Sequence, residues 1–146
     1  MGILTLLADA CKGGVPMLIT GLLLSDHPDR QLWVVLAGAA AFSGHLYPVY
    51  LKFEGGKGVA TALGVFLYLA PLAVLGAVIV FAVTVWRWRY ISLGSLVASA
   101  LLPVFLWFFG TPRLTIGLAF FVGALIWLKH RSNIGRLLRH EENRLK

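Results

Sequence analysis

The chain has 146 residues, of which 59% are hydrophobic and only 13% are charged, and its formal net charge at pH 7 is +7. Soluble domains carry about 45–50% apolar and about 25% charged residues, so this composition excludes an ordinary soluble protein, a disordered chain and a fibrous repeat. At about 20 residues per membrane-spanning helix, the length allows five or six spans with short loops. We therefore predict an all-α fold, a single polytopic membrane domain over residues 1–146.

Apolar runs follow one another along the chain with short polar breaks between them. We expect helices over residues 3–24, 32–50, 59–69, 71–85, 93–109 and 114–128. The stretch 59–85 is open to two interpretations, one long tilted helix or two short ones. Pro71 stands near its middle, and a proline inside a helix removes a backbone hydrogen bond.

The positions of the basic residues favour two short helices, and hence six spans. With six spans, ten of the 13 lysines and arginines share one face: Lys52, Lys57, Arg87, Arg89, Lys129, Arg131, Arg136, Arg139, Arg144 and Lys146. Arg30 and Arg113 lie on the other face, and Lys12 lies within the first helix. Because cytoplasmic loops concentrate Lys and Arg, we predict that both termini are cytoplasmic, and we attribute the net charge to topology rather than to nucleic-acid binding.

A glycine-rich loop joins the second and third runs, where Gly55, Gly56 and Gly58 surround Lys57. Glycines let the backbone approach a ligand closely, and the free N–H groups and dipole at the start of the next helix favour an anion. Together with the positive charge of Lys57, these features predict a phosphate cradle. The loop is not a Walker A motif, because Leu51 stands where that motif needs its first glycine. The alternative is a flexible turn with an interfacial lysine.

The segment 86–95 combines aromatic, basic and hydroxyl side chains at the end of one predicted span and the start of the next. Its tryptophans and arginines are typical of interfacial anchors. Ser92 and Ser95 differ, because they stand at the start of the next helix. A hydroxyl there either caps the helix or hydrogen-bonds a ligand.

The C-terminal segment 129–146 is predicted to be a cytoplasmic, basic, amphipathic tail. Leu137 and Leu138 are flanked by arginines, a pattern typical of a short helix that lies on the membrane. His130 and Asn133 are three residues apart and therefore share one face of a helix. Since neither residue helps to contact lipid, we take both as candidate ligand-binding residues.

The run Gly44-His45 … Pro48-Val49 … Phe53-Glu-Gly-Gly-Lys-Gly-Val-Ala-Thr61 resembles the second signature of the acyl-phosphate:glycerol-3-phosphate acyltransferases, the PlsY family. In the same order and spacing, residues 89–95 and 130–138 are similar to the family's third and C-terminal signatures. Residues 4–13 are similar to its second helix, so the resemblance covers essentially the whole chain. The family's first helix and its Gly-Ser-Gly-Asn-like loop have no counterpart in this sequence. We therefore expect an upstream segment or a separate chain to supply them, and we expect this chain alone to be inactive or nearly so.

This resemblance implies a bacterial inner-membrane enzyme of phospholipid biosynthesis, with seven spans in the full family fold and the active site facing the cytoplasm. It implies transfer of a fatty acyl group from acyl phosphate to the 1-hydroxyl of glycerol 3-phosphate, giving lysophosphatidate and phosphate, without a cofactor or metal. By matching position, the expected catalytic residues are Lys57, His130, Asn133 and Ser95. The expected substrate-binding residues are Gly55, Gly56, Gly58, Thr61, His45, Ser92 and Arg89.

The chemistry of the donor explains why few catalytic groups are needed. No Ser/His/Asp triad can be assembled from the sequence, and the His-x4-Asp motif of soluble acyltransferases is absent from it. Acyl phosphate is already activated, so positioning and charge neutralisation can supply most of the rate. A weak base suffices to accept the hydroxyl proton. His130 is one candidate for this base, and a phosphate oxygen of the substrate, which we favour slightly, is the other.

Two other functional classes are alternatives to the enzyme. A small transporter would place its binding groups near the bilayer midplane, where Asp9, Lys12 and His45 are the candidates. Asp9 and Lys12, at i and i+3, are also predicted to form an ion pair within the first helix. A lipid-binding membrane subunit without catalysis is the second alternative. The sequence predicts neither an acyl-chain preference nor an oligomeric state.

Overall fold

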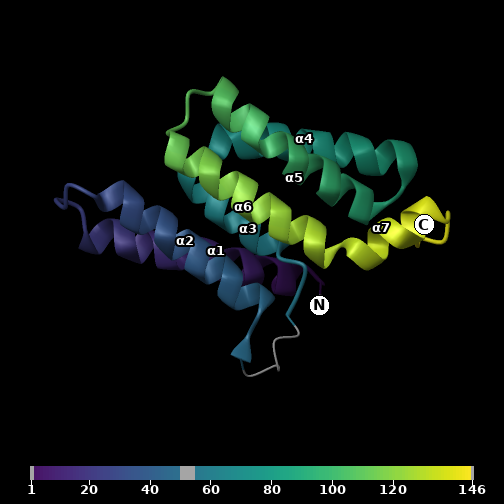
Figure 1. Cartoon of the computed structure of the whole chain (residues 1–146), viewed down its shortest axis with the longest axis horizontal. Coiled ribbons are helices and arrows are strands. Elements are labelled where there is room, and N and C mark those ends of the chain that lie inside the picture. Colours follow the sequence, from purple (N-terminus) through teal and green to yellow (C-terminus); the bar gives the residue numbers. More distant parts are fainter. Residues whose placement is uncertain (1, 50–54, 146) are drawn as a thin grey trace.

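The computed structural model describes residues 2–49 and 55–145, and within these ranges the chain is all-α (Figure 1). This confirms the predicted all-α fold. The charge and motif arguments also used Lys52, Phe53, Glu54 and Lys146, which lie outside the described residues. The described helices are α1 (Gly2–Leu23), α2 (Arg30–Leu46), α3 (Val59–Leu69), α4 (Pro71–Trp88), α5 (Ile91–Phe108), α6 (Arg113–Lys129) and α7 (Arg131–Leu138).

The stretch over which the sequence was ambiguous forms two helices. The α3 helix ends at Leu69, Ala70 has the extended φ of −156°, and α4 begins at Pro71. Proline is favoured at the first position of a helix, because the N–H group that it lacks would have no intrahelical partner there. The break therefore follows directly from the position of Pro71 in the sequence.

The lengths of several helices and the exposed apolar surface are those of a membrane protein. By length and composition, α1, α4 and α5 can each cross a membrane, and α6 with α7, which meet at 61°, would be a fourth span if the bent pair is counted as one. Large apolar side chains are exposed on every helix from α1 to α6, for example Leu18, Trp33, Leu67, Ile79, Trp107 and Phe120. Soluble monomers rarely expose so much contiguous apolar surface, so these faces suit contact with lipid.

Close packing of α1 on α3 organises one half of the bundle. A Cβ atom added at Gly64 would collide with the backbone carbonyl of Ala10, and one added at Gly13 would collide with that of Thr61. Small residues at a crossing let two membrane helices approach until their backbones touch, which maximises van der Waals contact. In the other half, α4 and α5 lie side by side, and α6 contacts both α2 and α5 (Figure 1).

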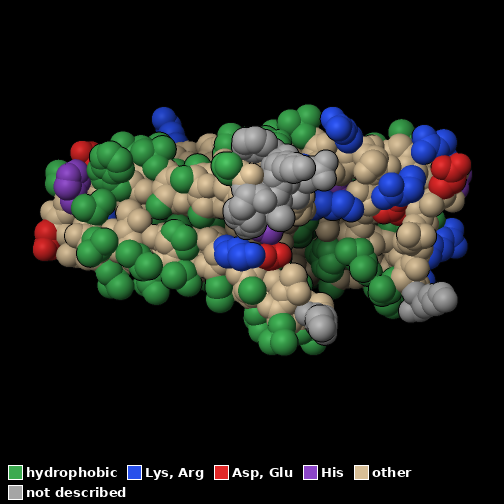
Figure 2. Space-filling model, turned by 90° about the horizontal axis from the view of Figure 1, so that it is seen from below, with side chains coloured by type: hydrophobic (Ala, Val, Ile, Leu, Met, Phe, Trp, Pro, Cys, Tyr) green, Lys and Arg blue, Asp and Glu red, His purple; other side chains and the backbone are tan. Residues whose placement is uncertain are grey.

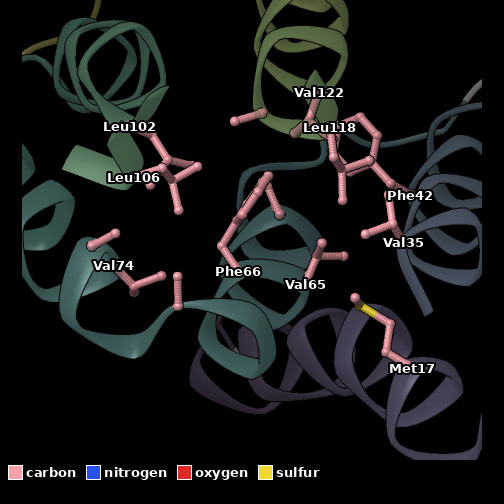
Figure 3. Close-up of a cluster of buried hydrophobic side chains, with 14 of the residues drawn as sticks. Met17, Val35, Phe42, Val65, Phe66, Val74, Leu102, Leu106, Leu118 and Val122 are labelled. Carbon is pink, nitrogen blue, oxygen red and sulfur yellow. The ribbon is translucent and has the colours of Figure 1, made fainter. Parts of the chain in front are cut away.

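Buried apolar side chains from the first six helices form one continuous cluster, part of which is drawn in Figure 3. Its members with the least exposure include Met17 on α1, Phe42 on α2, Phe66 on α3, Leu106 on α5 and Val122 on α6. This cluster connects the two halves of the bundle. It also lies against the inner end of the cavity described below.

Candidate active site

A cavity of about 640 Å³ lies among α3, α4, α5 and α6, and its two ends differ in chemistry. Apart from Ser99, which lies further along α5, the polar side chains on its wall gather where α3 and α5 begin and α6 ends: Lys57, Ser92, Ser95, His130, Asn133, Glu142, Asn143 and Arg144. Most of the remaining wall is apolar. All four residues expected to be catalytic therefore line one cavity, although they come from separate segments of the chain.

Lys57 lies in the loop directly before α3, and its side chain is exposed at the cavity mouth. The next residue, Gly58, has φ of +78°, a left-handed conformation that glycine adopts without strain. A Cβ atom added at Gly58 would lie 2.5 Å from Leu46 and 2.7 Å from Phe42, so the loop is pressed against the end of α2. No side chain caps α3, which leaves its first N–H groups available to an anion.

His130 lies at the bend between α6 and α7 and is buried. Its Nδ1 is 2.8 Å from the carbonyl oxygen of Ile126. Because a carbonyl can only accept, Nδ1 carries the proton, and Nε2 of the neutral ring is the basic nitrogen. Burial lowers the pKa of His130, and the nearby positive charge of Lys57 lowers it further, against the opposing effects of the Ile126 carbonyl and Glu142. The ring is therefore neutral at pH 7, and Nε2 can accept a proton.

Glu142 is a site residue that sequence reasoning missed. Its Oε1 accepts hydrogen bonds from the hydroxyl of Ser92 at 2.7 Å and from the side-chain amide of Asn133 at 2.6 Å. Its Oε2 accepts one from Nε of Arg136 at 2.7 Å. Burial acts to raise the pKa of Glu142, but these three donors outweigh it, and the net pKa is lowered. The only signal in the sequence was an acidic pair, Glu141-Glu142, within a basic tail.

The same network leaves one buried acceptor without a partner, on a residue that lines the cavity. Asn133 is buried and donates its Nδ2 to Glu142, whereas its Oδ1 has no hydrogen-bond partner among the described residues. A buried carbonyl oxygen without a partner is costly, and a ligand hydroxyl would satisfy it. Ser95, one turn below Ser92 on α5, donates its own hydroxyl to the backbone oxygen of Ile91 at 3.0 Å.

The C-terminal segment is tied across the turn between α4 and α5. The backbone N–H of Leu145 donates to the carbonyl of Arg89 at 2.7 Å. The guanidinium of Arg144 donates to the Tyr90 hydroxyl at 3.0 Å and lies over the same ring. These contacts bring residues 142–145 to the cavity wall and so explain how a tail residue reaches Ser92.

Arg89 does not join the other expected binding residues. Its backbone is left-handed, with φ of 61°, and it ends α4. Its side chain lines a smaller cavity with Val85, Trp86 and Leu145, separate from the main cavity. Arg89 therefore contributes to the site through its backbone carbonyl, which accepts the hydrogen bond from Leu145, rather than through its side chain.

His45 and the first two glycines of the loop lie behind the cavity wall rather than on it. A Cβ atom added at Gly56 would lie 2.8 Å from Nε2 of His45, and one added at Gly55 would meet the carbonyl of His45. On its other side, Nδ1 of His45 is 3.7 Å from Asp9, which forms the predicted ion pair with Lys12 at 2.9 Å. His45 is thus positioned to support the loop rather than to contact a ligand.

Thr61 is also off the cavity wall. It is fully buried in the first turn of α3 against α1, and its hydroxyl has no hydrogen-bond partner among the described residues.

Lys129 fixes the end of α2, because its Nζ donates to the carbonyl of Leu46 at 2.8 Å and lies 4.3 Å from the ring centre of Tyr47. Of the seven expected substrate-binding residues, Ser92 lies on the wall of the main cavity. Gly55, Gly56, Gly58 and His45 form or contact the loop, whereas Thr61 and Arg89 lie elsewhere.

Comparisons with known proteins find relatives along nearly the whole chain. A family model described as glycerol-3-phosphate acyltransferase matches residues 1–140. The chain is 54% identical to the glycerol-3-phosphate acyltransferase of Syntrophotalea carbinolica, an alignment that covers 100% of this chain and 73% of the relative. It is 47% identical to that of Geobacter sulfurreducens, again over 100% of this chain and 73% of the relative.

Two solved structures share the fold. Both are crystal structures of PlsY, an integral membrane glycerol 3-phosphate acyltransferase, one in a lysophosphatidic acid form and one in a glycerol 3-phosphate form. Each matches with a TM-score of 0.91 and 37% sequence identity over 99% of this chain, covering 72% and 71% of the respective PlsY chains.

Proposed function

Because this chain belongs to the glycerol-3-phosphate acyltransferase family, we propose that its cavity transfers a fatty acyl group from an acyl phosphate to the 1-hydroxyl of glycerol 3-phosphate. The products are lysophosphatidate and inorganic phosphate. The protein is an acyltransferase of bacterial membranes and acts in phospholipid biosynthesis. One observation carries the proposal: the cavity joins a polar end of the kind that binds anions to an apolar body of the kind that binds lipid.

At the polar end, Lys57 and the free N–H groups at the start of α3 bind a phosphate group. A preorganised cation and backbone donors stabilise negative charge most strongly where water is excluded. Ser95, His130 and Asn133 hold glycerol 3-phosphate, and the unpartnered Oδ1 of Asn133 accepts a hydroxyl of that substrate. Glu142 holds the Asn133 side chain in the orientation that this requires.

In the reaction, the 1-hydroxyl oxygen of glycerol 3-phosphate attacks the acyl carbonyl carbon of acyl phosphate. A new ester bond forms as the bond between the carbonyl carbon and the phosphate oxygen breaks, and phosphate leaves. The hydroxyl proton passes either to Nε2 of His130 or to a phosphate oxygen of the substrate itself. The neutral, buried His130 with its Nδ1 bound to Ile126 supports the first route. The good leaving group supports the second.

We further propose six membrane crossings, formed by α1 to α6, with both termini and the polar end of the cavity on the cytoplasmic side of the inner membrane. Most of the lysine and arginine side chains visible in Figure 2 lie toward the end of the molecule that carries the C-terminal segment, where acidic side chains are visible as well, and few lie toward the opposite end. This asymmetry agrees with the positive-inside rule. The three shorter helices, α2 and α6 with 17 residues each and α3 with 11, would cross a thinner region.

Acyl transfer tests the proposed reaction directly. The protein is expressed from its gene with the natural upstream region, purified in detergent and incubated with radiolabelled glycerol 3-phosphate and palmitoyl phosphate. We expect labelled lysophosphatidate and free phosphate in equal amounts, and strongly reduced product from Lys57→Ala. Absence of product, together with uptake of glycerol 3-phosphate by proteoliposomes, would instead favour the transporter alternative.

Labelling of single cysteines tests the proposed topology. Cys11 is the only cysteine, so a Cys11→Ser background accepts one new cysteine at a time. We expect a membrane-impermeant maleimide to label Arg139→Cys only from the cytoplasmic side and Arg113→Cys only from the opposite side. Labelling of both from the same side would show that α6 does not cross the membrane between these two positions.

A further inference from the structure

The middle of the cavity is kept open by small side chains on three helices. Ala77 on α4, Ala98 and Ser99 on α5, and Ala119 and Gly123 on α6 all line it. Among them Gly123 is unusual, because nothing in its surroundings requires glycine. A Cβ atom added there would meet only the carbonyl oxygen of Ser99, at 3.6 Å, an ordinary contact distance.

Gly123 therefore differs from the glycines at the crossing of α1 and α3. At Gly64 an added Cβ atom would collide with the backbone of the neighbouring helix, so close packing explains that glycine. Glycine inside a helix is destabilising relative to alanine. At Gly123 the compensating gain is open space beside Ser99, which lies about two thirds of the way along α5 from Ser92 to Leu102.

The inner end of the cavity lies against the buried cluster. Phe66, Val74 and Leu102 line it and belong to the buried cluster, with exposures of 1%, 6% and 9% (Figure 3). Leu102 lies ten residues beyond Ser92 on α5, which is about 15 Å along a helix. An extended hydrocarbon chain that starts at the polar end would run down this length and stop at the three side chains.

We propose that the depth of this cavity sets the acyl-chain length that is preferred in the donor. Phe66, Val74 and Leu102 form a floor that sets the longest chain to be fully enclosed, and Gly123 opposite Ser99 keeps the passage to that floor open. The inference rests on the proposed function, since the chain that it measures belongs to the acyl donor. Each methylene enclosed before the floor strengthens binding about fourfold, and each one beyond it adds nothing.

A matched pair of substitutions on α6 tests the passage. Gly123→Leu places a side chain in the cavity, whereas Gly117→Leu places the same side chain on the exposed face, where nothing lies within 4 Å. Initial rates are measured with saturated acyl phosphates of increasing even chain length. We expect the rate ratio of shorter to longer donors to rise about tenfold or more in Gly123→Leu, as at least two methylenes are excluded. We expect no change of the ratio in Gly117→Leu.

Leu102→Ala tests the floor in the opposite direction, because shortening that side chain deepens the cavity. We expect the preferred donor to become longer in this variant. If Gly123→Leu fails to fold, Gly123→Ala serves in its place, since its Cβ atom has room, with a smaller shift toward short donors. A chain-length profile that stays the same in the cavity variants and in the control would overturn the proposal.

A binding measurement separates this inference from the proposed reaction. Monoalkyl phosphates carry the phosphate and the chain but cannot donate an acyl group. We expect their stabilisation of the purified protein against thermal unfolding to increase with chain length up to the floor and to shift with the same variants. If no acyl phosphate is a donor, the proposed function fails. The alkyl phosphate series would still show whether the depth of the cavity limits the chain length that binds.

Discussion

Asn133 donates a hydrogen bond of 2.6 Å from its side-chain amide to Glu142, nine residues further along the chain. The same carboxylate oxygen accepts the Ser92 hydroxyl from α5. One acid therefore joins α5 to the segment after α7 and fixes the orientation of the Asn133 side chain. Because Nδ2 is committed to Glu142, Oδ1 is the side-chain atom of Asn133 that is left without a partner among the described residues.

Glu142→Gln should weaken binding of glycerol 3-phosphate. The substitution keeps the size of the side chain but removes the charge that attracts three donors, and a hydrogen bond to a charged group contributes about 1.5–3 kcal/mol. We expect KM for glycerol 3-phosphate to rise about 10- to 100-fold, with a smaller change in KM for acyl phosphate. Glu141→Gln is the matched control, since Glu141 pairs with Arg139 on the exposed surface. Equal effects of the two substitutions would refute the role of Glu142.

Glu142 should also make stability depend on pH. Its pKa is lower in the folded protein than its ordinary value of 4.5, so the unfolded chain binds more protons at acid pH. The stabilisation is then fully present above about pH 4.5 and is lost as the pH falls through the lowered folded pKa. In thermal unfolding from about pH 7 to about pH 3, the Tm difference between wild type and Glu142→Gln should shrink as the pH falls. A constant difference would show that the carboxylate charge is not the cause.

Lys57→Ala should abolish most acyl transfer without unfolding the protein. The side chain is exposed in a loop and supports no core, so its loss is chemical. Removing a direct cation–phosphate contact costs about 2–4 kcal/mol of transition-state stabilisation, or about 30- to 1000-fold in rate. Turnover and Tm are both measured, with Arg131→Ala as the control, since Arg131 is another exposed basic residue and follows His130 in the chain. Near-normal turnover in Lys57→Ala would exclude the phosphate cradle.

The dependence of the rate on pH should identify the base. If Nε2 of His130 accepts the hydroxyl proton, kcat/KM rises with pH through a pKa below 6.5, because protonated His130 cannot accept. His130→Gln then lowers kcat about 10²- to 10⁴-fold and removes this rise. If the substrate phosphate is the base, the rise persists in His130→Gln and the change falls mainly on KM for glycerol 3-phosphate. His140→Asn is the control, an exposed histidine with φ of 57°, a conformation that asparagine tolerates.

Much of the fold could be predicted because apolar runs and helix breakers act locally. The expected helices over 59–69 and 114–128 match α3 and α6 to within a residue at each end. The run expected to reach residue 50 ends as a helix at Leu46, where Lys129 from a distant segment caps the last turn. That contact joins positions 83 apart in the chain, which no local pattern reports.

The site was predictable only in so far as its residues have distinctive chemistry. Lys57, Ser95, His130 and Asn133 stood out as polar residues at span ends, and they line one cavity. Glu142 was missed because its role depends on long-range contacts. The tail crosses the turn at Arg89, and Glu142 then meets Ser92, which lies 50 positions earlier in the chain. A charged residue in a basic tail has the same local pattern whether it faces water or closes a cavity.

Gly58→Ala should lower both stability and activity, because glycine is required there for two reasons, the backbone conformation and the close packing. Its φ of +78° is strained for any residue with a Cβ atom, and that atom would also press on Leu46 and Phe42 at the end of α2. The left-handed conformation alone costs about 1–2 kcal/mol, and relief of the overlap moves Lys57 away from the cavity mouth. We expect a lower Tm and a loss of turnover approaching that of Lys57→Ala. Gly117→Ala is the control, because its added Cβ atom meets open space, and it should change neither quantity. Unchanged turnover in Gly58→Ala would mean that the loop geometry does not position Lys57 for phosphate.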